Sequence, residues 1–495
     1  MAFVSLSQTT TKFSATVIPH HKHTNYGKDL QDIRAIAQRA FSRSADAPLI
    51  GGNSVKLLID AELNYDAWIR AIAKAKRVIY FENYIIHNDK TGRRFRDALT
   101  ERAEAGVKVR VLHDWVGCFG LSRKFWEPLL AARGRVRVHN PPKLYSPVEI
   151  LSRDHRKMLA VDGHTGFVSG ICISDTWLGN EAKGIEPWRD TGVEIRGPAV
   201  TDLLEAFRNV WAESGRAIDK REMESQETPE KAGDVDVRVI ATSPRSLNLY
   251  RLDLMITAIA QKRLWLTDAY FAGVPAYVQA LKAAAQDGVD VRLLVPGGSD
   301  LPWLRPISTA GYRPLLESGV RVFEWNGSML HAKTAVADDR WARVGSTNLN
   351  IASWMTNHEL DVAIENEEFA TKMAEVYEND LEHSTEIVLR AKKRVRLPTD
   401  DERQSRPGGG SIARVTAGAL RLSRSVSAAV LNHRVLGPAE SRSLAITALM
   451  IITLAAFALL FPRIVSWIIA AVLVWTGIVL LLHSLYLYRQ GRRKG

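Results

Sequence analysis

Cysteine is scarce in this sequence, which holds only Cys118 and Cys172 in 495 residues. Two cysteines cannot form a disulfide scaffold or a structural zinc site of four thiolates, and this composition favours a reducing compartment. An apolar core segment is absent from the first 18 residues, which are rich in Ser and Thr, so no signal peptide is predicted.

Acidic residues are outnumbered, with 54 Asp and Glu against 66 Lys and Arg, and the formal net charge at pH 7 is +12. This excess indicates an anionic partner, and nucleic acid and an anionic membrane surface are both open at this point. Apolar residues make up 46% of the chain and charged residues 24%, which excludes a mostly disordered chain and a mostly transmembrane one.

Asp, Glu, Lys and Arg are absent from two long stretches near the C-terminus, 444–461 and 464–488. Eighteen helical residues reach about 27 Å, close to the hydrocarbon thickness of a bilayer. A transmembrane helical hairpin is therefore predicted over 441–490, and a pair of buried core helices is the alternative. Lys and Arg cluster outside both spans whereas the turn carries only Arg463, so both ends of the hairpin are expected on the cytoplasmic side. The basic stretch 393–440 is either an amphipathic helix on the membrane or a flexible tether.

The rest of the chain is doubled. Residues 71–78 resemble 258–264, and 105–112 resemble 287–294. In each half a helix, an apolar strand, a second helix and a Gly-Val-x-Val strand follow one another, which predicts two α/β lobes with largely buried sheets. The predicted parts are an N-terminal tail (1–48), lobe 1 (49–225), lobe 2 (235–392), the basic linker (393–440) and the hairpin (441–490).

Each lobe carries one His-x-Lys-x4-Asp motif, and the two motifs have the same spacing. The apolar residues between Lys and Asp predict a strand, on which His and Lys project from one face. An ammonium beside an imidazole suits attack on a phosphodiester, because the lysine neutralises phosphate oxygens while the imidazole attacks phosphorus or moves a proton. Two coincidental strand histidines are the alternative. The candidate catalytic residues are His155, Lys157, Asp162, His331, Lys333 and Asp338.

Polar residues that could complete such a site follow the motifs. Ser346 and Asn348 lie in a Gly-Ser-Thr-Asn segment and can donate hydrogen bonds to phosphate oxygens. Asp190 and Glu359 lie farther along each half. A carboxylate that reaches the second ring nitrogen of a histidine fixes its tautomer and raises its basicity, so both are predicted to orient the histidines.

These motifs resemble those of the phospholipase D superfamily, and other segments resemble its bacterial cardiolipin synthase branch. The resemblance covers roughly residues 50–390. It implies two duplicated phospholipase D-like α/β lobes that share one active site, with no metal and no cofactor. The other segments that carry it are Glu82-Asn83-Tyr84, Trp188-Arg189-Asp190-Thr191, Ile195-Arg196-Gly197-Pro198-Ala199-Val200 and Ala269-Tyr270-Phe271.

The resemblance also implies a double displacement. His155 is assigned as the nucleophile that forms a phosphohistidine and His331 as the general acid and base, although the near symmetry of the lobes leaves the reverse open. Lys157 and Lys333 would hold the non-bridging oxygens. Asp162 and Asp338 belong to the motif, but a structural role is favoured for them because they lie at the far ends of their strands.

The sequence departs from the family pattern at Cys172, where the family usually has Asn as a phosphate ligand. A thiol is a weaker donor than an amide, so a looser phosphate clamp is expected from the first lobe. The pair Ser169-Gly170 also departs from the usual Gly-Gly.

The activity that the resemblance implies is phosphatidyl transfer from one phosphatidylglycerol to another, with release of glycerol. The alternatives are a phospholipase D or transphosphatidylase that uses water or another alcohol, a nuclease of the same superfamily, and a catalytically silent binding protein. The expected partners are phospholipid substrates and not nucleic acid. The protein is expected to be anchored in the bacterial plasma (inner) membrane, with the lobes on the cytoplasmic side.

Overall fold

The computed structural model describes residues 26–142, 152–219, 229–301 and 305–389, together with four isolated positions between 467 and 475. The chain divides into two compact units, Met1–Phe41 and Ser42–Gly495. Helix α1 (Tyr26–Ala45) begins in the first unit, so part of the predicted tail is helical. Apart from those four positions, the predicted linker and hairpin lie outside the described residues. Within the described ranges no helix is both long enough and apolar enough to cross a bilayer.

Fifteen strands of the second unit form one mixed sheet in the described chain. Strands β2, β3 and β4 are mutually parallel, as are β9, β10 and β11, and the remaining pairs are antiparallel. The first-lobe strands are β1 (Ile50–Ile59), β2 (Val78–Asn83), β3 (Lys108–Asp114), β4 (Arg135–His139), β5 (Lys157–Val161), β6 (Thr165–Ser169) and β7 (Thr191–Arg196). The second-lobe strands are β8 (Val235–Thr242), β9 (Arg263–Thr267), β10 (Asp290–Pro296), β11 (Arg321–Trp325), β12 (Thr334–Ala337), β13 (Trp341–Gly345), β14 (Glu359–Glu365) and β15 (Ser384–Ile387).

The strand order shows the duplication directly. It runs β1-β7-β6-β5-β2-β3-β4 in the first lobe and β8-β14-β13-β12-β9-β10-β11 in the second, with β15 at the outer edge. The two predicted lobes do not have separate sheets, because β1 and β8 pair antiparallel and join the lobes into one sheet. Ile50 faces Val237 and Asn53 faces Val235, with an irregularity between them.

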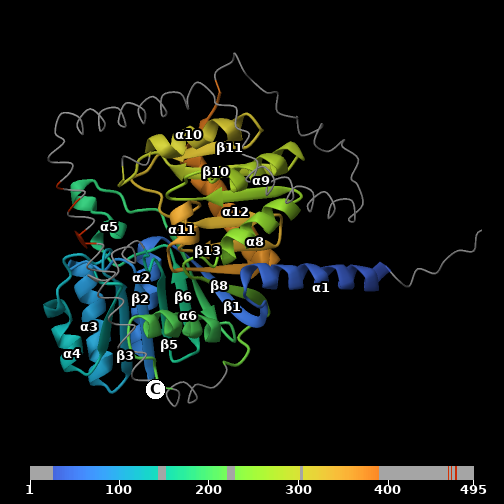
Figure 1. Ribbon diagram of the computed structural model, residues 1–495. Coiled ribbons are helices and arrows are strands. Elements are labelled where there is room, and N and C mark those ends of the chain that lie inside the picture. The colour runs from blue at the N-terminus through green and yellow to red at the C-terminus, as the bar shows by residue number, and fades with distance from the viewer. Residues whose placement is uncertain are drawn as a thin grey trace, which may run out of the picture. The chain divides into compact units, whose positions relative to one another are not determined.

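Helices cover both faces of this sheet (Figure 1). In the first lobe α2, α3 and α4 pack together, and α6 lies over β2, β5 and β6. In the second lobe α8, α9 and α10 pack together, and α12 lies over β12, β13 and β14. The helices are α2 (Asp60–Lys74), α3 (Lys90–Glu104), η1 (Arg123–Trp126), α4 (Glu127–Ala131), α5 (Asp175–Leu178), η3 (Glu181–Lys183), α6 (Val200–Glu213), α8 (Asn248–Ile259), α9 (Pro275–Gln286), α10 (Arg305–Leu316), α11 (Ile351–Met355) and α12 (Glu367–Glu382).

The two lobes share one hydrophobic core beneath α6 and α12. Phe207 and Trp211 of α6 belong to the same buried cluster as Phe369 and Tyr377 of α12. A second buried cluster lies under α2, α3 and α4 in the first lobe. Strands buried on both faces need apolar residues on both faces, which explains the near-continuous apolar runs of the sequence.

Candidate active site

Both motif histidines lie just before their strands and not within them. The prediction placed the whole motif on a strand, but β5 begins at Lys157 and β12 at Thr334. The His155 amide donates to the His358 carbonyl at 2.9 Å, and the His331 amide donates to the Arg189 carbonyl at 2.7 Å. The ladders start later because these amides bond across to the other lobe.

These backbone contacts bring each histidine to a carboxylate of the opposite lobe. The His155 Nδ1 lies 2.9 Å from Glu359 Oε2, and the His331 Nδ1 lies 2.7 Å from Asp190 Oδ2. All four side chains are buried. The sequence predicted both carboxylates as orienting groups but did not assign either to a histidine, and the structure pairs them across the lobes.

Burial sets the charge of these pairs. It lowers the pKa of His155, and it lowers the pKa of His331 to about 3, with the Lys333 ammonium adding to the effect. Burial raises the pKa of Glu359 and Asp190, but the neighbouring histidines and lysines outweigh it and lower both below the usual range. At neutral pH the rings are therefore neutral and the carboxylates ionised. Each Nδ1–H donates to its carboxylate, and Nε2 keeps a lone pair for attack or proton transfer.

The two motif lysines are buried beside the histidines. The Lys157 ammonium donates to the His155 carbonyl at 2.5 Å, and the Lys333 ammonium donates to the His331 carbonyl and lies within 3.0 Å of both ring nitrogens. Burial lowers the pKa of Lys333 to about 8, and the nearby Lys157 contributes to this shift. The two ammonium groups therefore face one site, which suits an anionic phosphodiester.

Aromatic rings enclose the imidazoles, and sequence reasoning did not assign them to the site. The Tyr84 ring lies 4.7 Å from the His155 ring, and Tyr270, in the same place in the second lobe, lies 5.8 Å from His331. The indole N–H of Trp177 donates to Asp190 at 3.1 Å, and the Trp188 ring lies 5.7 Å from His331. The only signal was that Tyr84, Tyr270 and Trp188 fell in segments that carried the family resemblance.

Arg156, the middle residue of the first motif, is a further link between the lobes. Its guanidinium donates to the carbonyls of Glu359, Ala206 and Thr242 at 3.1, 2.8 and 3.1 Å. The side chain points away from the histidines, as the strand alternation predicts, and it fixes the backbone of the carboxylate that His155 contacts.

The Ser346 hydroxyl supports Glu359. It donates to Glu359 Oε2 at 2.6 Å and accepts from the Leu360 amide at 3.0 Å. A hydroxyl has one proton, so the predicted donation to phosphate is not available in this arrangement. Asn348 is buried, and the N–H groups of its side-chain amide are the donors that a phosphate ligand at this position would need, so Asn348 stays a candidate.

The first lobe supports its carboxylate differently. A Cβ added at Gly170 would lie 2.3 Å from Asp190 Oδ1, so a serine there would clash, and the Trp177 indole supplies the hydrogen bond instead. Cys172 is buried, and burial raises the pKa of its thiol although Lys157 opposes the shift.

The motif aspartates lie at the far ends of β5 and β12. Asp162 accepts the amides of Lys76, Arg77 and Val78 at 2.8, 2.7 and 2.9 Å. Asp338 accepts the corresponding three amides, from Gln261 to Arg263, in the second lobe. Both have positive φ, 55° and 50°. They bind the chain where it enters β2 and β9 and do not reach the histidines.

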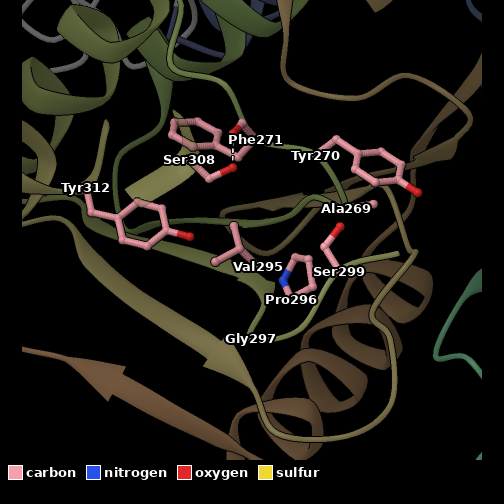
Figure 2. A pocket seen from close by; sticks show the side chains of 9 residues that line it. All are labelled: Ala269, Tyr270, Phe271, Val295, Pro296, Gly297, Ser299, Ser308 and Tyr312. Atoms are coloured by element: carbon pink, nitrogen blue, oxygen red, sulfur yellow. Dashed lines mark hydrogen bonds between the residues drawn. The ribbon is translucent and has the colours of Figure 1, made fainter. Parts of the chain in front are cut away.

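A narrow pocket of about 20 Å³, large enough for a water molecule, opens beside Tyr270 at the carboxyl ends of β9 and β10. Figure 2 shows the Tyr270 ring on one side of it and Phe271, Ser308 and Tyr312 on the other. The Ser308 hydroxyl donates to the Phe271 carbonyl at 2.6 Å, and the Tyr270 hydroxyl donates to Asp300 at 2.9 Å. These bonds hold the segment that places Tyr270 against His331.

A family model described as "Cardiolipin synthase, PLD-like domain" matches residues 68–211 and 255–381, one segment in each lobe. The chain belongs to the PLD-like cardiolipin synthase family. This confirms the resemblance that the motifs indicated.

Bacterial members of the family match this chain over most of their length. The chain is 34% identical over 345 residues to the cardiolipin synthase of Alkalihalophilus pseudofirmus, which covers 69% of this chain and 68% of that one. It is 33% identical over 365 residues to cardiolipin synthase A of Pseudomonas aeruginosa, covering 72% and 73%. Among solved structures, the phosphatidylserine synthase of Haemophilus influenzae has the same fold, with a TM-score of 0.58 at 17% identity, over 78% of this chain and 99% of that one.

Proposed function

We propose that the protein is a cardiolipin synthase that transfers a phosphatidyl group from one phosphatidylglycerol to another and releases glycerol. The observation that carries this proposal is the pair of histidine–carboxylate contacts, His155 with Glu359 and His331 with Asp190, formed around two buried lysines. This chain covers two thirds or more of relatives that are named cardiolipin synthases, and their name supports cardiolipin as the product.

In the first half-reaction, His155 Nε2 bonds to phosphorus while the bond from phosphorus to the glycerol oxygen breaks. The leaving oxygen takes a proton from His331, which must enter this step as imidazolium. In the free protein burial keeps that ring neutral. An anionic phosphodiester arriving beside it favours the charged form, so the ring would take up a proton from solvent as the substrate binds and give it back when the product leaves.

In the second half-reaction, a hydroxyl of the acceptor phosphatidylglycerol gives its proton to His331 as its oxygen bonds to phosphorus. The bond from phosphorus to His155 breaks, and both rings return to their starting state. Lys157 and Lys333 offset the charge on the phosphorane oxygens, while Glu359 and Asp190 hold the ring tautomers. The near symmetry of the lobes allows the two histidines to exchange these roles.

The location of the lobes forms part of the proposal. We place the chain at the inner membrane of a bacterium through a transmembrane hairpin over 441–490, with the lobes on the cytoplasmic side. The uncharged stretches and the position of the flanking Lys and Arg support this. Deletion of residues 441–495 should release part of the protein from membranes with both lobes folded. Cleavage of residues 50–390 by protease added outside intact cells would refute the orientation.

Expression in a bacterial host that lacks cardiolipin tests the function. The unsubstituted chain should restore cardiolipin, and the purified protein should form cardiolipin and glycerol in equal amounts from phosphatidylglycerol. His155→Ala and His331→Ala should each abolish both products, and trapped protein should carry an acid-labile, base-stable phosphoryl label. Phosphatidic acid as the main product would instead indicate a phospholipase D that uses water.

A further inference from the structure

An exposed apolar loop follows β3 at the edge of the active site. This β3 loop, residues 115–122, presents Phe119 with 79% of its surface exposed and Val116 with 40%. The half-buried Trp115 ring contacts the Phe119 ring edge-on at 5.5 Å. Single exposed apolar residues are common on protein surfaces, but two large exposed residues beside a half-buried tryptophan within five positions form a patch that marks an interaction site.

The loop is bound to the segment that carries the nucleophile. Asp114, at the end of β3, accepts the amides of Val116 and Gly117 at 2.8 and 3.0 Å through one oxygen. Its other oxygen accepts the amide of Asp154, the residue before His155, at 3.0 Å. A carboxylate shared in this way keeps the loop at a constant position relative to His155.

The loop also contacts the aromatic wall of the site. A Cβ added at Gly117 would lie 2.1 Å from the Tyr84 carbonyl oxygen, so only glycine permits this close approach. The Cys118 sulfur accepts the Ile86 amide at 3.2 Å, just beyond Tyr84. The Tyr84 ring lies 4.7 Å from His155, so one residue, Tyr84, links the backbone of the β3 loop to the candidate nucleophile.

The charged residues between positions 115 and 126 are of one sign. Arg123 and Lys124 follow the β3 loop and are exposed, and residues 115–126 contain no Asp or Glu. Aromatic and aliphatic side chains next to lysine and arginine are the composition with which proteins enter the surface of an anionic bilayer. Phosphatidylglycerol, the substrate that the proposed function assigns, is anionic.

We infer that the β3 loop inserts into the surface of an anionic bilayer beside the active site. Phe119 and Val116 enter the acyl boundary while Arg123 and Lys124 contact lipid phosphates. This inference rests on the proposed function for the identity of the lipid, and it gives the lobes their own contact with the membrane, separate from the proposed hairpin.

A fluorescent label reports insertion without any chemistry. The full-length protein carrying Phe119→Cys is labelled with an environment-sensitive dye and mixed with vesicles of phosphatidylglycerol and phosphatidylcholine that contain a membrane-bound quencher. Ile259→Cys is the matched control, since Ile259 is an exposed apolar residue at the end of α8, close to the Asp338 end of β12. Cys118 and Cys172 are buried, and the unsubstituted protein gives the background labelling.

The label at 119 should shift to the blue and be quenched, and the label at 259 should do neither. A double variant with Arg123→Gln and Lys124→Gln should bind anionic vesicles more weakly, with the affinity falling about fivefold for each charge removed. Its affinity for vesicles of phosphatidylcholine alone should not change. If the label at 119 shows neither the blue shift nor the quenching with phosphatidylglycerol vesicles, the inference is wrong.

Kinetics separate this inference from the function. Phe119→Ser should lower turnover on phosphatidylglycerol vesicles and leave turnover on a short-chain, monomeric phosphatidylglycerol unchanged. An equal loss on both substrates would show that the loop supports the fold and does not bind the bilayer. If the unsubstituted protein transfers neither substrate, the proposed function fails, while the label still decides whether the loop inserts.

Discussion

The His155 Nδ1 lies 2.9 Å from the Glu359 carboxylate, although the two residues are 204 positions apart and belong to different lobes. The reciprocal pair, His331 and Asp190, is 141 positions apart. Neither lobe holds a complete histidine–carboxylate pair by itself. The site is therefore completed only when the two lobes fold against each other.

Removing the charge of either orienting carboxylate should slow turnover. Glu359→Gln and Asp190→Asn can no longer stabilise the imidazolium or select its tautomer, so kcat should fall by about 10²–10⁴-fold. Steady-state kinetics on phosphatidylglycerol measures the loss. Glu194→Gln on β7, whose carboxylate accepts a hydrogen bond from the exposed Arg196 side chain, is the matched control. Variants that keep kcat within twofold of the unsubstituted protein would refute the orienting role.

The Lys333 ammonium should impose an alkaline limit on activity. Burial lowers its pKa to about 8, so the charge that offsets the phosphorane is present below that pH and is lost above it. The ratio kcat/KM reports groups of the free enzyme and should fall as pH rises through about 8. The profile is measured with circular dichroism at each pH to exclude unfolding. A constant kcat/KM up to pH 10 would contradict this prediction.

A buried carboxyl pair next to the site should make stability depend on pH. Burial raises the pKa of Glu82 from 4.5 to about 7 and that of Asp154 well above its usual value. Between pH 4.5 and about 7 the folded state therefore keeps a proton on Glu82 that the unfolded chain has released. The contribution of Glu82 is complete below pH 4.5 and is lost as pH rises through about 7, a loss of the order of 3 kcal/mol.

Glu82→Gln should therefore raise the unfolding free energy at pH 8 more than at pH 5 and flatten the dependence between them. Urea unfolding at both pH values measures the effect. The exposed Glu104→Gln on α3 is the control and should change neither value. A Glu82→Gln protein with the same slope as the unsubstituted chain would show that Glu82 is ionised in the folded state.

The motif aspartates should support folding and not chemistry. Asp162→Ala removes the acceptor of three backbone amides and leaves alanine at φ 55°, so it should lower the unfolding free energy by about 1–3 kcal/mol. Asp162→Asn, which tolerates this backbone region, should lose less. Thermal unfolding measures stability, and kcat of the folded fraction should stay close to normal. A collapse of kcat without a stability change would assign Asp162 to catalysis.

Cys172→Asn should remain active and transfer at least as fast as the unsubstituted protein. An amide adds a neutral hydrogen bond worth about 0.5–1.5 kcal/mol net, where a buried thiol offers little. If that bond strengthens in the transition state, the gain appears in kcat and not in KM. Kinetics on phosphatidylglycerol vesicles decides. A folded variant without activity would show that the first lobe has repacked around sulfur.

The duplicated motifs and the α/β character were predictable because both depend on local patterns. A repeated His-x-Lys-x4-Asp signature, apolar runs and Gly-Val-x-Val strands can be read from a few neighbouring residues. The same local reading named Asp190 and Glu359 as carboxylates available to the histidines. It also favoured a structural role for Asp162 and Asp338, and their hydrogen bonds to backbone amides agree with that role.

Only the tertiary structure decided how these residues are paired. Each histidine contacts a carboxylate of the other lobe because two isolated β-bridges join segments that are far apart in the chain. These bridges pair Asp154 with His358 and Arg189 with Leu330. The same contacts place both histidines before their strands. The pairing of β13 with β14 inside the second lobe brings the Ser346 hydroxyl to Glu359. The sequence by itself determined which chemical groups are present in each lobe. Which group meets which depends on long-range backbone pairing, which no local pattern encodes.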